Sequence, residues 1–275
     1  RVAGADQGPD HHRVEVLRDG QRMSTHIVEG RFSDCRVIVT GAGSGIGRAT
    51  AVRLLAEGAT VIATDISEPR LAALAEEFAS DRLVTFAGDI SDEDVVTEIV
   101  QVADGEITSL ANIAGIMDDF LPPAEVEDAV WDRVLRVNLT AVMRLTRAVL
   151  PGMLERGSGT IVNVSSEAAL RGSAAGAAYT ASKHAVNGLT RSTAFFYGAK
   201  GVRCNAVAPG ATITNIQAEF RSAFAGERMA PYMQTNVPQP AAAEDLAAAI
   251  TWLLSDDSAN VNGAVLPSDA GWSVI

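Results

Sequence analysis

The sequence predicts an α/β protein with a doubly wound parallel sheet of about seven strands and helices on both faces. Three observations predict this fold class. Short apolar runs alternate along the chain with helical stretches of ten or more residues, an order typical of α/β proteins. The runs are apolar almost without interruption, as parallel strands buried on both faces are. A glycine-rich loop follows the first run, so we expect a ligand site beyond the carboxyl ends of the strands.

The local signals divide the chain into strands and helices in turn. Gly58 ends the first helix, Pro69 opens the second, and Ser91 caps the third with Asp92 and Glu93 in its first turn. We expect strands at 37–39, 60–64, 83–87, 110–113, 160–164, 202–207 and 264–266. We expect helices at 46–57, at 69–78, after Ser91, and at 127–156, 179–197 and 243–254. Right-handed crossovers between these strands build a Rossmann fold.

The first 33 residues differ from the rest of the chain. They show no sustained periodicity and contain Gly-Pro and Asp-Gly pairs. We expect residues 1–33 to form an irregular extension and residues 34–275 to form one domain, since nothing in the middle resembles a linker. The adjacent His11 and His12 are more often solvated than metal-bound on such a segment, so no metal site is expected.

Composition and charge exclude several classes of partner. The 275 residues carry 34 acidic against 22 basic side chains, a net charge of −12, and no basic cluster that nucleic acid or an anionic membrane would need. No apolar stretch reaches the roughly 20 residues of a membrane helix, and residues 1–33 lack the apolar core of a signal peptide. Cys35 and Cys204 lie far apart in apolar runs, as buried free thiols do. We therefore expect a soluble cytoplasmic protein.

The glycine loop between the first strand and its helix is suited to a dinucleotide. Its glycines follow the pattern G-x-x-x-G-x-G at Gly41, Gly45 and Gly47 rather than G-x-G-x-x-G. Such a loop allows a tight turn, a close approach of the backbone to a pyrophosphate, and a helix N-terminus aimed at it. A glycine turn without a ligand is the alternative, which its position directly after the first strand disfavours.

One acidic residue indicates which dinucleotide binds. Asp65 ends the second strand about twenty residues after the loop, where a carboxylate accepts hydrogen bonds from the ribose hydroxyls and repels a 2′-phosphate. The loop position before Gly45 is Ser44, with no Arg or Lys for that phosphate. Both features favour NAD over NADP, although Asp65 alone could be an ordinary turn residue.

Tyr179 and Lys183 lie four residues apart, on one face of a predicted helix. A tyrosine with a pKa near 10 is a poor base at neutral pH, but a neighbouring ammonium lowers that pKa and makes a proton shuttle for alcohol oxidation or carbonyl reduction. The four-residue spacing of Tyr179 and Lys183 alone would also fit two residues on the protein surface. Ser166, thirteen residues earlier and just past a strand, could donate to the substrate oxygen. Asn138 lies in an apolar stripe, either as a structural bridge or in a water relay behind Lys183.

These motifs, in this order, resemble the short-chain dehydrogenase/reductase family, in its compact single-domain branch. The resemblance covers residues 34–275, and it rests on Thr40–Gly47, Asn112–Gly115, Asn138, Ser166, Tyr179–Lys183 and Pro209-Gly210.

The resemblance implies a catalytic tetrad of Asn138, Ser166, Tyr179 and Lys183. In it, Tyr179 is general acid/base, Ser166 polarises the substrate oxygen, Lys183 lowers the tyrosine pKa and binds the nicotinamide ribose, and Asn138 holds a relay water. It also implies cofactor contacts at Gly41, Ser44, Gly45, Ile46, Gly47, Asp65, Ile66, Asp89, Ile90, Asn112, Ala114, Gly115, Tyr179, Lys183, Pro209, Gly210, Thr212 and Thr214.

The sequence departs from the family pattern at a few positions. Ile113 replaces a common Asn, Ser268–Gly271 replaces a more usual Val-Asp-Gly-Gly, and Thr212 replaces an Ile or Val. Glu167, directly after Ser166, is unexpected: it is either solvated or points into the substrate pocket, where it would disfavour carboxylate substrates.

We therefore expect an NAD-dependent oxidoreductase that transfers hydride between the nicotinamide and a secondary alcohol or ketone. A catalytically silent nucleotide-binding or scaffolding protein of the same fold is the alternative, which the intact tetrad disfavours. A nucleotide-sugar epimerase is a second alternative, but that class resembles a longer chain than this one, with a different spacing of the loop glycines. The resemblance implies a homotetramer joined through helices 127–156 and 179–197. Residues 215–237 would form a substrate lid, whose Phe220, Phe224, Met229, Tyr232 and Met233 are either pocket wall or ordinary packing.

Overall fold

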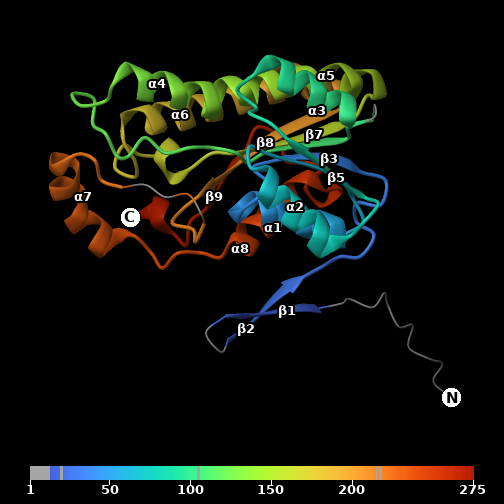
Figure 1. The fold of residues 1–275 in the computed structure, drawn as a ribbon, viewed down its shortest axis with the longest axis horizontal. Helices are drawn as coiled ribbons and strands as arrows, with labels where there is room; N and C mark the ends of the chain where they lie inside the picture. The colour runs from blue at the N-terminus through green and yellow to red at the C-terminus, as the bar shows by residue number, and fades with distance from the viewer. Residues whose placement is uncertain (1–12, 19–20, 104–105, 215, 217–218) are drawn as a thin grey trace.

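The sheet of this computed structural model has seven parallel strands in the order β5-β4-β3-β6-β7-β8-β9 (Figure 1). The structure describes residues 13–18, 21–103, 106–214, 216 and 219–275. The strands are β3 (Arg36–Thr40), β4 (Thr60–Asp65), β5 (Leu83–Ala87), β6 (Ser109–Asn112), β7 (Gly159–Val164), β8 (Val202–Pro209) and β9 (Val265–Ser268). The strand order reverses between β3 and β6, and a doubly wound sheet binds its ligand at this point. The predicted fold class is confirmed.

Alternating residues of the strands pack helices against both faces of the sheet. Val37 and Val39 of β3 face the core shared with α1 and α8, whereas Ile38 faces the core shared with α3 and α5. Figure 1 shows α5 and α6 along one side of the sheet and α1, α2 and α8 on the other. The helices are α1 (Gly45–Ala56), α2 (Glu68–Phe78), α3 (Glu93–Val102), α4 (Asp128–Leu135), α5 (Ala141–Arg156), α6 (Ala177–Tyr197), α7 (Ala223–Asn236) and α8 (Ala243–Leu254).

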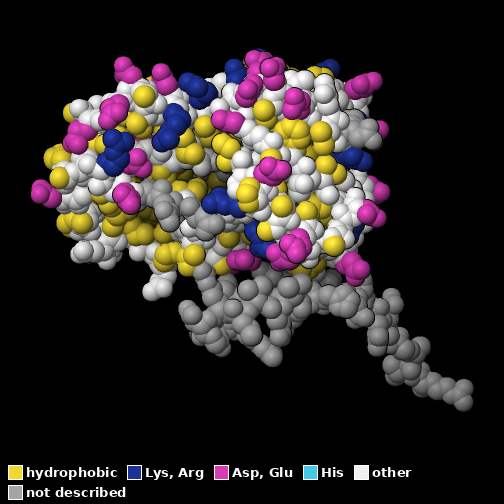
Figure 2. All heavy atoms as spheres, in the orientation of Figure 1, with side chains coloured by type: hydrophobic (Ala, Val, Ile, Leu, Met, Phe, Trp, Pro, Cys, Tyr) yellow, Lys and Arg dark blue, Asp and Glu magenta, His cyan; other side chains and the backbone are white. Residues whose placement is uncertain are grey.

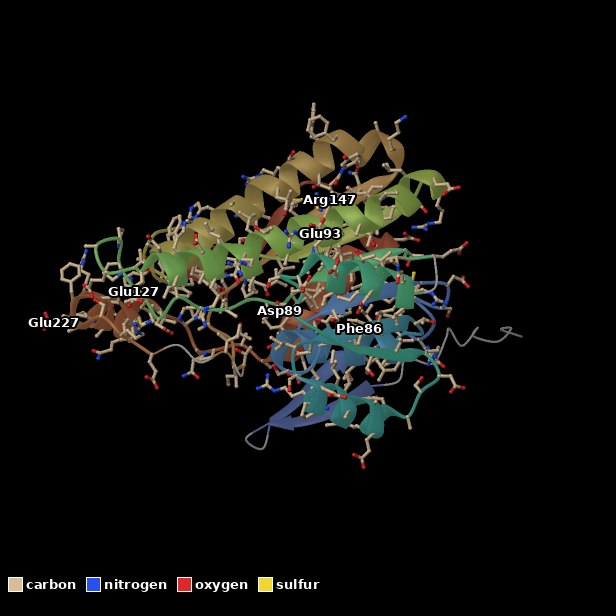
Figure 3. The ribbon with its side chains drawn as sticks, turned by 45° about the horizontal axis from the view of Figure 1, so that its top comes forward. Phe86, Asp89, Glu93, Glu127, Arg147 and Glu227 are labelled. Atoms are coloured by element: carbon tan, nitrogen blue, oxygen red, sulfur yellow. The ribbon has the colours of Figure 1, made fainter. Side chains whose placement is uncertain are left out.

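Charged side chains fasten α3 to α5 on the outer side of their layer. Figure 3 shows Glu93 of α3 facing Arg147 of α5, whose Nη2 lies 2.7 Å from Glu93 Oε1. Figure 2 shows acidic and basic side chains interspersed over one face of the molecule. The described residues include no helix that is both long and apolar enough to span a membrane.

Two helix predictions need correction. The cap of α3 is Asp92, whose side chain accepts from the Asp94 N–H at 2.9 Å, because Asp89 already holds the Ser91 N–H at 2.9 Å in a turn. The expected helix 127–156 is continuous in direction but contains a π-helical turn over Arg136–Thr140 that separates α4 from α5. Short 3-10 turns cover Glu167–Ala169, Gly198–Lys200, Asp256–Ser258 and Trp272–Val274.

The N-terminal segment is not irregular over the part that the structure describes. Strands β1 (Arg13–Arg18) and β2 (Gln21–His26) pair antiparallel, and Figure 1 shows them below the helical layer that contains α8. An Asp-Gly pair between two short runs is a strong hairpin signal, which the sequence carries at residues 19–20. Phe32 is buried in the core beside α1, and the domain boundary at residue 33 stays a prediction. His11 and His12 lie outside the described residues.

Candidate active site

A cavity of about 1070 Å³ opens at the carboxyl ends of the strands, where the strand order reverses. It brings together nearly all of the residues that the sequence singled out. Two of them, Asn112 and Asn138, lie behind its wall. The predicted residues that line it are Gly41, Ser44, Gly45, Ile46, Gly47, Asp65, Ile66, Asp89, Ile90, Ala114, Gly115, Ser166, Tyr179, Lys183, Pro209, Gly210, Thr212 and Thr214.

The glycine loop and the N-terminus of α1 line this cavity. Helix α1 begins at Gly45, and the side chain of its N-cap, Ser44, makes no capping hydrogen bond within the described part of the chain. Gly47 has no room for a side chain, because a Cβ there would lie 2.0 Å from the Gly41 carbonyl oxygen. A helix N-terminus with free N–H groups binds anions without any cationic side chain. The donor set therefore fits the pyrophosphate of a dinucleotide.

Asp65 is buried at the end of β4, and its carboxylate already shapes the loop. Oδ2 accepts from the Gly43 N–H at 3.0 Å and Oδ1 from the Ser67 N–H at 2.9 Å. Arg70, an exposed residue of α2, also lines this part of the cavity. A Cβ at Gly43 would meet both Asp65 and the Arg70 Cβ, at 2.8 and 2.9 Å. Sequence reasoning missed Arg70 because it looked for a cation only within the loop, whereas the first turn of α2 brings one alongside Asp65.

The side chain of Asn112 is part of the core rather than of the cavity wall. Its Nδ2 donates to Asn163 Oδ1 at 2.8 Å, and Asn163 Nδ2 donates to Thr190 Oγ1 at 2.9 Å. These bonds join β6, β7 and α6 beneath the site. The predicted contact of Asn112 with a cofactor stays a prediction, and its Nδ2 is already used within the core.

Tyr179, Ser166 and Lys183 converge on one wall of the cavity. Tyr179 lies in the first turn of α6, and Lys183 follows one turn later with its Nζ 5.5 Å from the centre of the tyrosine ring. The Lys183 ammonium is buried and donates to the Val164 carbonyl at 2.9 Å. Ser166 follows β7, accepts from the Ala168 N–H at 3.0 Å, and forms a side-chain hydrogen bond with Tyr179. The three groups thus form one connected set.

Burial controls the protonation of both Tyr179 and Lys183. It raises the pKa of Tyr179 to about 12, a rise that the Asp118 charge supports and the Ser166 hydrogen bond opposes. Burial also lowers the pKa of Lys183 to about 8. The sequence predicted that Lys183 would lower the pKa of Tyr179. The structure shows the opposite direction, because loss of solvation of the phenolate is the largest influence on the pKa of Tyr179.

Asn138 occupies the π-helical turn between α4 and α5, completely buried. Its Oδ1 accepts from the Ile116 N–H at 2.8 Å and its Nδ2 donates to the Ile116 carbonyl at 2.9 Å. A Cβ at Gly115 would lie 3.3 Å from Asn138 Oδ1 and 3.4 Å from Lys183 Nζ, so the amide sits directly behind the lysine. These contacts fit the structural bridge predicted for Asn138, and its role in a water relay stays a prediction. π-Helical turns are frequent at functional sites.

Glu167 lines the cavity and is only 1% exposed, so the solvated alternative is wrong. Its carboxylate forms an ion pair with Arg171, and burial raises its pKa. Arg171 also donates to the Trp272 carbonyl at 2.6 Å and to Tyr232 Oη at 2.8 Å. This arginine, which the sequence analysis did not single out, ties the C-terminal segment and α7 to the turn after Ser166.

The predicted lid contributes fewer residues to the cavity than its composition suggested. Of its five large aromatic and methionine residues, only Met233 lines the cavity. Phe220 stacks on Phe120 with ring centroids 4.3 Å apart, and Phe224 is exposed. Tyr232 accepts hydrogen bonds from Arg171 and from Trp272 Nε1, so most of the set serves packing and fastening.

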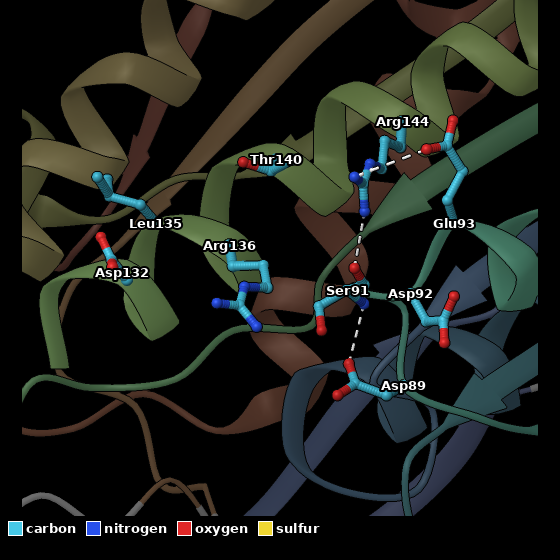
Figure 4. A pocket seen from close by; sticks show the side chains of 9 residues that line it. All are labelled: Asp89, Ser91, Asp92, Glu93, Asp132, Leu135, Arg136, Thr140 and Arg144. Carbon is cyan, nitrogen blue, oxygen red and sulfur yellow. Dashed lines mark hydrogen bonds and ion pairs between the residues drawn. The ribbon is translucent and has the colours of Figure 1, made fainter. Parts of the chain in front are cut away.

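A second hollow of about 780 Å³ adjoins the cavity between α3 and α4 (Figure 4). Arg144 donates to the Ser91 carbonyl at 2.8 Å, and Asp89 accepts from the Ser91 N–H, as Figure 4 shows. Asp89 lines both hollows, and its carboxylate is directed to a turn of its own backbone. The nine residues drawn in Figure 4 are mostly charged, and their acids and bases are intermixed.

The comparisons with known proteins agree with this geometry. The family model of short chain dehydrogenases matches residues 36–224. The chain is 40% identical to the short-chain dehydrogenase/reductase cdmF of Talaromyces verruculosus over 90% of this chain and 100% of the relative. It is 41% identical to 3beta-hydroxysteroid dehydrogenase 2 of Eggerthella lenta over 86% of this chain and 94% of the relative. The chain therefore belongs to the short-chain dehydrogenase/reductase family, as its motifs predicted.

Solved structures show the same fold with either dinucleotide. Levodione reductase superposes with a TM-score of 0.79 at 37% identity, over 88% of this chain and 99% of that one. An NAD(P)-dependent protein from Beutenbergia cavernae (TM-score 0.79, 34% identity, 90% and 100% coverage) holds NADP at low occupancy. A 3-oxoacyl-[acyl-carrier protein] reductase from Brucella melitensis holds NAD; it superposes with a TM-score of 0.78 at 30% identity, over 88% of this chain and 92% of that one. The last two of these structures thus bind a nicotinamide dinucleotide.

Proposed function

We propose that the protein is an NAD-dependent oxidoreductase that interconverts a secondary alcohol and a ketone. One observation carries the proposal: Ser166, Tyr179 and Lys183 line the same cavity as the glycine loop and Asp65. The residues proposed to exchange a proton therefore line the same cavity as the residues that fit a dinucleotide. The bound nicotinamide supplies the hydride acceptor or donor.

Each of the three side chains has a separate task in this proposal. Ser166, which is hydrogen-bonded to Tyr179, orients the substrate oxygen. Tyr179 holds the proton that this oxygen gains or loses. Lys183 faces the tyrosine ring as a cation and favours the phenolate over the phenol, against the burial that raises the pKa of Tyr179. Asn138 keeps the Ile116 backbone in place behind Lys183.

We further propose that NAD is preferred to NADP. The buried Asp65 carboxylate lies where a 2′-phosphate would approach, and like charges at short range repel. Arg70 is the opposing feature, because an arginine at the same part of the cavity can bind a phosphate. Since Asp65 is buried and Arg70 exposed, the carboxylate is the less screened of the two charges and the preference follows it.

The substrate that fits this cavity is a largely apolar alcohol or ketone. Met117, Phe120, Ile216, Met233 and Trp272 line it beside the reacting groups. The relative from Eggerthella lenta is by name a 3beta-hydroxysteroid dehydrogenase, and a steroid is a largely apolar ring compound with a secondary alcohol, which supports this substrate class. Glu167 adds a buried acid to the wall and disfavours substrates with a carboxylate.

The remaining parts of the proposal are a homotetramer and a cytoplasmic location. Phe195 and Phe196, at the end of α6, are 80% and 65% exposed, which suits a helix face that another subunit covers. Cys35 and Cys204 are free thiols in the described part of the chain, as in a reducing compartment. Light scattering on the purified protein tests the assembly, since a monomeric mass contradicts it.

A panel of secondary alcohols oxidised with NAD, followed by the absorbance of NADH, tests the activity. We expect turnover with cyclic apolar alcohols and none with the Tyr179→Phe variant. Tight NADH binding without turnover of any alcohol, or of the matching ketones with NADH, would instead support the catalytically silent alternative.

A further inference from the structure

Asp118 lies in the loop that joins β6 to α4, and its side chain is completely buried. No motif of the sequence singles it out. Its carboxylate accepts three backbone hydrogen bonds, from the Tyr179 N–H at 2.8 Å, the Gly176 N–H at 3.1 Å and the Phe120 N–H at 3.2 Å. Two of these donors belong to the start of α6, the helix that carries Tyr179 and Lys183.

The carboxylate thus caps α6 from another segment of the chain. The N-cap residue of α6 is Gly176, which has no side chain to satisfy the first N–H groups of the helix. A Cβ at position 176 would lie 2.6 Å from both Asp118 oxygens, so glycine makes room for the acid. A negative charge at a helix N-terminus also has favourable electrostatics.

The loop around Asp118 is strained and is fastened to the same helix. Asp119 and Phe120 both have φ of 54°, a left-handed conformation that residues with a side chain rarely adopt. Asp118 holds this turn through the Phe120 N–H and through its own carbonyl, which accepts from the Leu121 N–H at 3.2 Å. The Leu121 carbonyl in turn accepts from the Ala177 N–H of α6 at 2.9 Å.

The same loop contacts the other parts of the candidate site. Its Ile116 backbone pairs with Asn138, behind Lys183. Its Phe120 lines the cavity and stacks on Phe220 of the lid. A single loop therefore connects Asn138, the lid and the first turn of α6, and Asp118 is the residue in it that bonds to the tyrosine.

We infer that Asp118 is a positioning residue for the proposed reaction: its buried carboxylate holds the first turn of α6 so that the Tyr179 phenol meets Ser166 within the cavity. This inference rests on the proposed function for its catalytic consequence. The contacts themselves do not depend on the activity.

The charge of Asp118 has a second effect on the tyrosine. The groups that face Tyr179 are Ser166, which lowers its pKa through a hydrogen bond, Asp118, which raises it, and the Lys183 ammonium at its ring. Removal of the Asp118 charge therefore shifts ionisation of Tyr179 to lower pH. Loss of the cap, in contrast, lets the phenol move away from Ser166, and a misplacement of about 1 Å can cost about 100-fold in rate.

The Asp118→Asn variant tests both effects, because asparagine keeps the shape and one acceptor but loses the charge. We expect kcat to fall by about tenfold or more with the KM for the dinucleotide nearly unchanged, and the pH profile of kcat to move to lower pH. The matched control is Asp92→Ala, which removes the cap of α3 and lowers stability without contact to Tyr179. Its pH profile should equal that of the wild type.

A readout without turnover separates this inference from the proposed function. The absorbance of tyrosinate, taken as the difference between each protein and its Tyr179→Phe counterpart, reports ionisation of Tyr179 alone. We expect an earlier onset with rising pH in Asp118→Asn. If that variant does not fold, Asp118→Ser removes the charge and keeps a capping oxygen. A folded variant with the wild-type tyrosinate titration would overturn the inference, whether or not an alcohol substrate has been found.

Discussion

The Nζ of Lys183 lies 5.5 Å from the centre of the Tyr179 ring, and one of its N–H groups donates to the Val164 carbonyl, 2.9 Å away. The ammonium is therefore a charge beside the tyrosine ring, anchored to the end of β7. The hydrogen-bond partner of the phenol is Ser166. Lys183 is buried and Tyr179 is partly buried, and the loss of solvation raises the pKa of the tyrosine to about 12.

The first prediction concerns stability at alkaline pH. Burial raises the pKa of Tyr179 from 10.0 to about 12, so folding keeps the phenol protonated between these values while the unfolded chain loses the proton. The stabilisation is complete below pH 10 and is lost as the pH rises through about 12. Relative to Tyr179→Phe, the wild type should therefore lose about 2–3 kcal/mol of unfolding free energy over this range. Urea unfolding of both proteins across this pH range measures the loss. The same pH dependence of the unfolding free energy in both proteins would contradict the prediction.

The second prediction concerns turnover. Tyr179→Phe removes only the hydroxyl oxygen, so we expect alcohol oxidation to fall by about 100-fold or more while NADH binding stays near that of the wild type. Steady-state kinetics and fluorescence titration with NADH measure the two quantities. Tyr197→Phe, at the other end of α6, is the matched control and should retain full activity. An unchanged rate in Tyr179→Phe would remove this residue from the mechanism.

The sequence predicted the parts of the fold that local pattern controls. Apolar runs indicated the strands of the parallel sheet. The sequence also singled out Ser166, Tyr179 and Lys183, and the structure places all three around the same cavity as the glycine loop. These residues sit at strand ends and on one helix face, and sequence spacing determines both. The hairpin β1–β2 was missed although the Asp-Gly signal for it was present.

The parts that sequence could not predict depend on contacts between distant segments. No local sequence pattern marks three residues of the site, because their roles depend on contacts made in the folded chain. These residues are Asp118, Arg70 and Arg171. The pKa direction of Tyr179 was wrong for a related reason. A spacing of four residues shows that a lysine is near, but only the packed structure shows that burial outweighs the lysine.

The third prediction concerns cofactor choice. NADH should bind at least several-fold more tightly than NADPH, because the Asp65 carboxylate would repel the 2′-phosphate of NADPH. Asp65→Ser should weaken NADH and tighten NADPH, and adding Arg70→Ala should remove the gain for NADPH, since Arg70 is then the group that holds the phosphate. Fluorescence titrations with both dinucleotides measure these changes. Equal affinities in the wild type would contradict the role of Asp65.

The last prediction concerns the pair formed by Glu167 and Arg171. Arg171→Met leaves the buried Glu167 carboxylate without its cation and frees the Trp272 carbonyl and Tyr232, so we expect a loss of about 3–5 kcal/mol of unfolding free energy. Part of that loss comes from the stranded charge alone. The double variant Arg171→Met with Glu167→Gln should therefore recover a portion of it, because a neutral amide is much cheaper to bury than an unpaired carboxylate. Urea unfolding of the wild type, the two single variants and the double variant completes the cycle. Additive effects of the two substitutions would show that the ion pair does not stabilise the wall of the cavity.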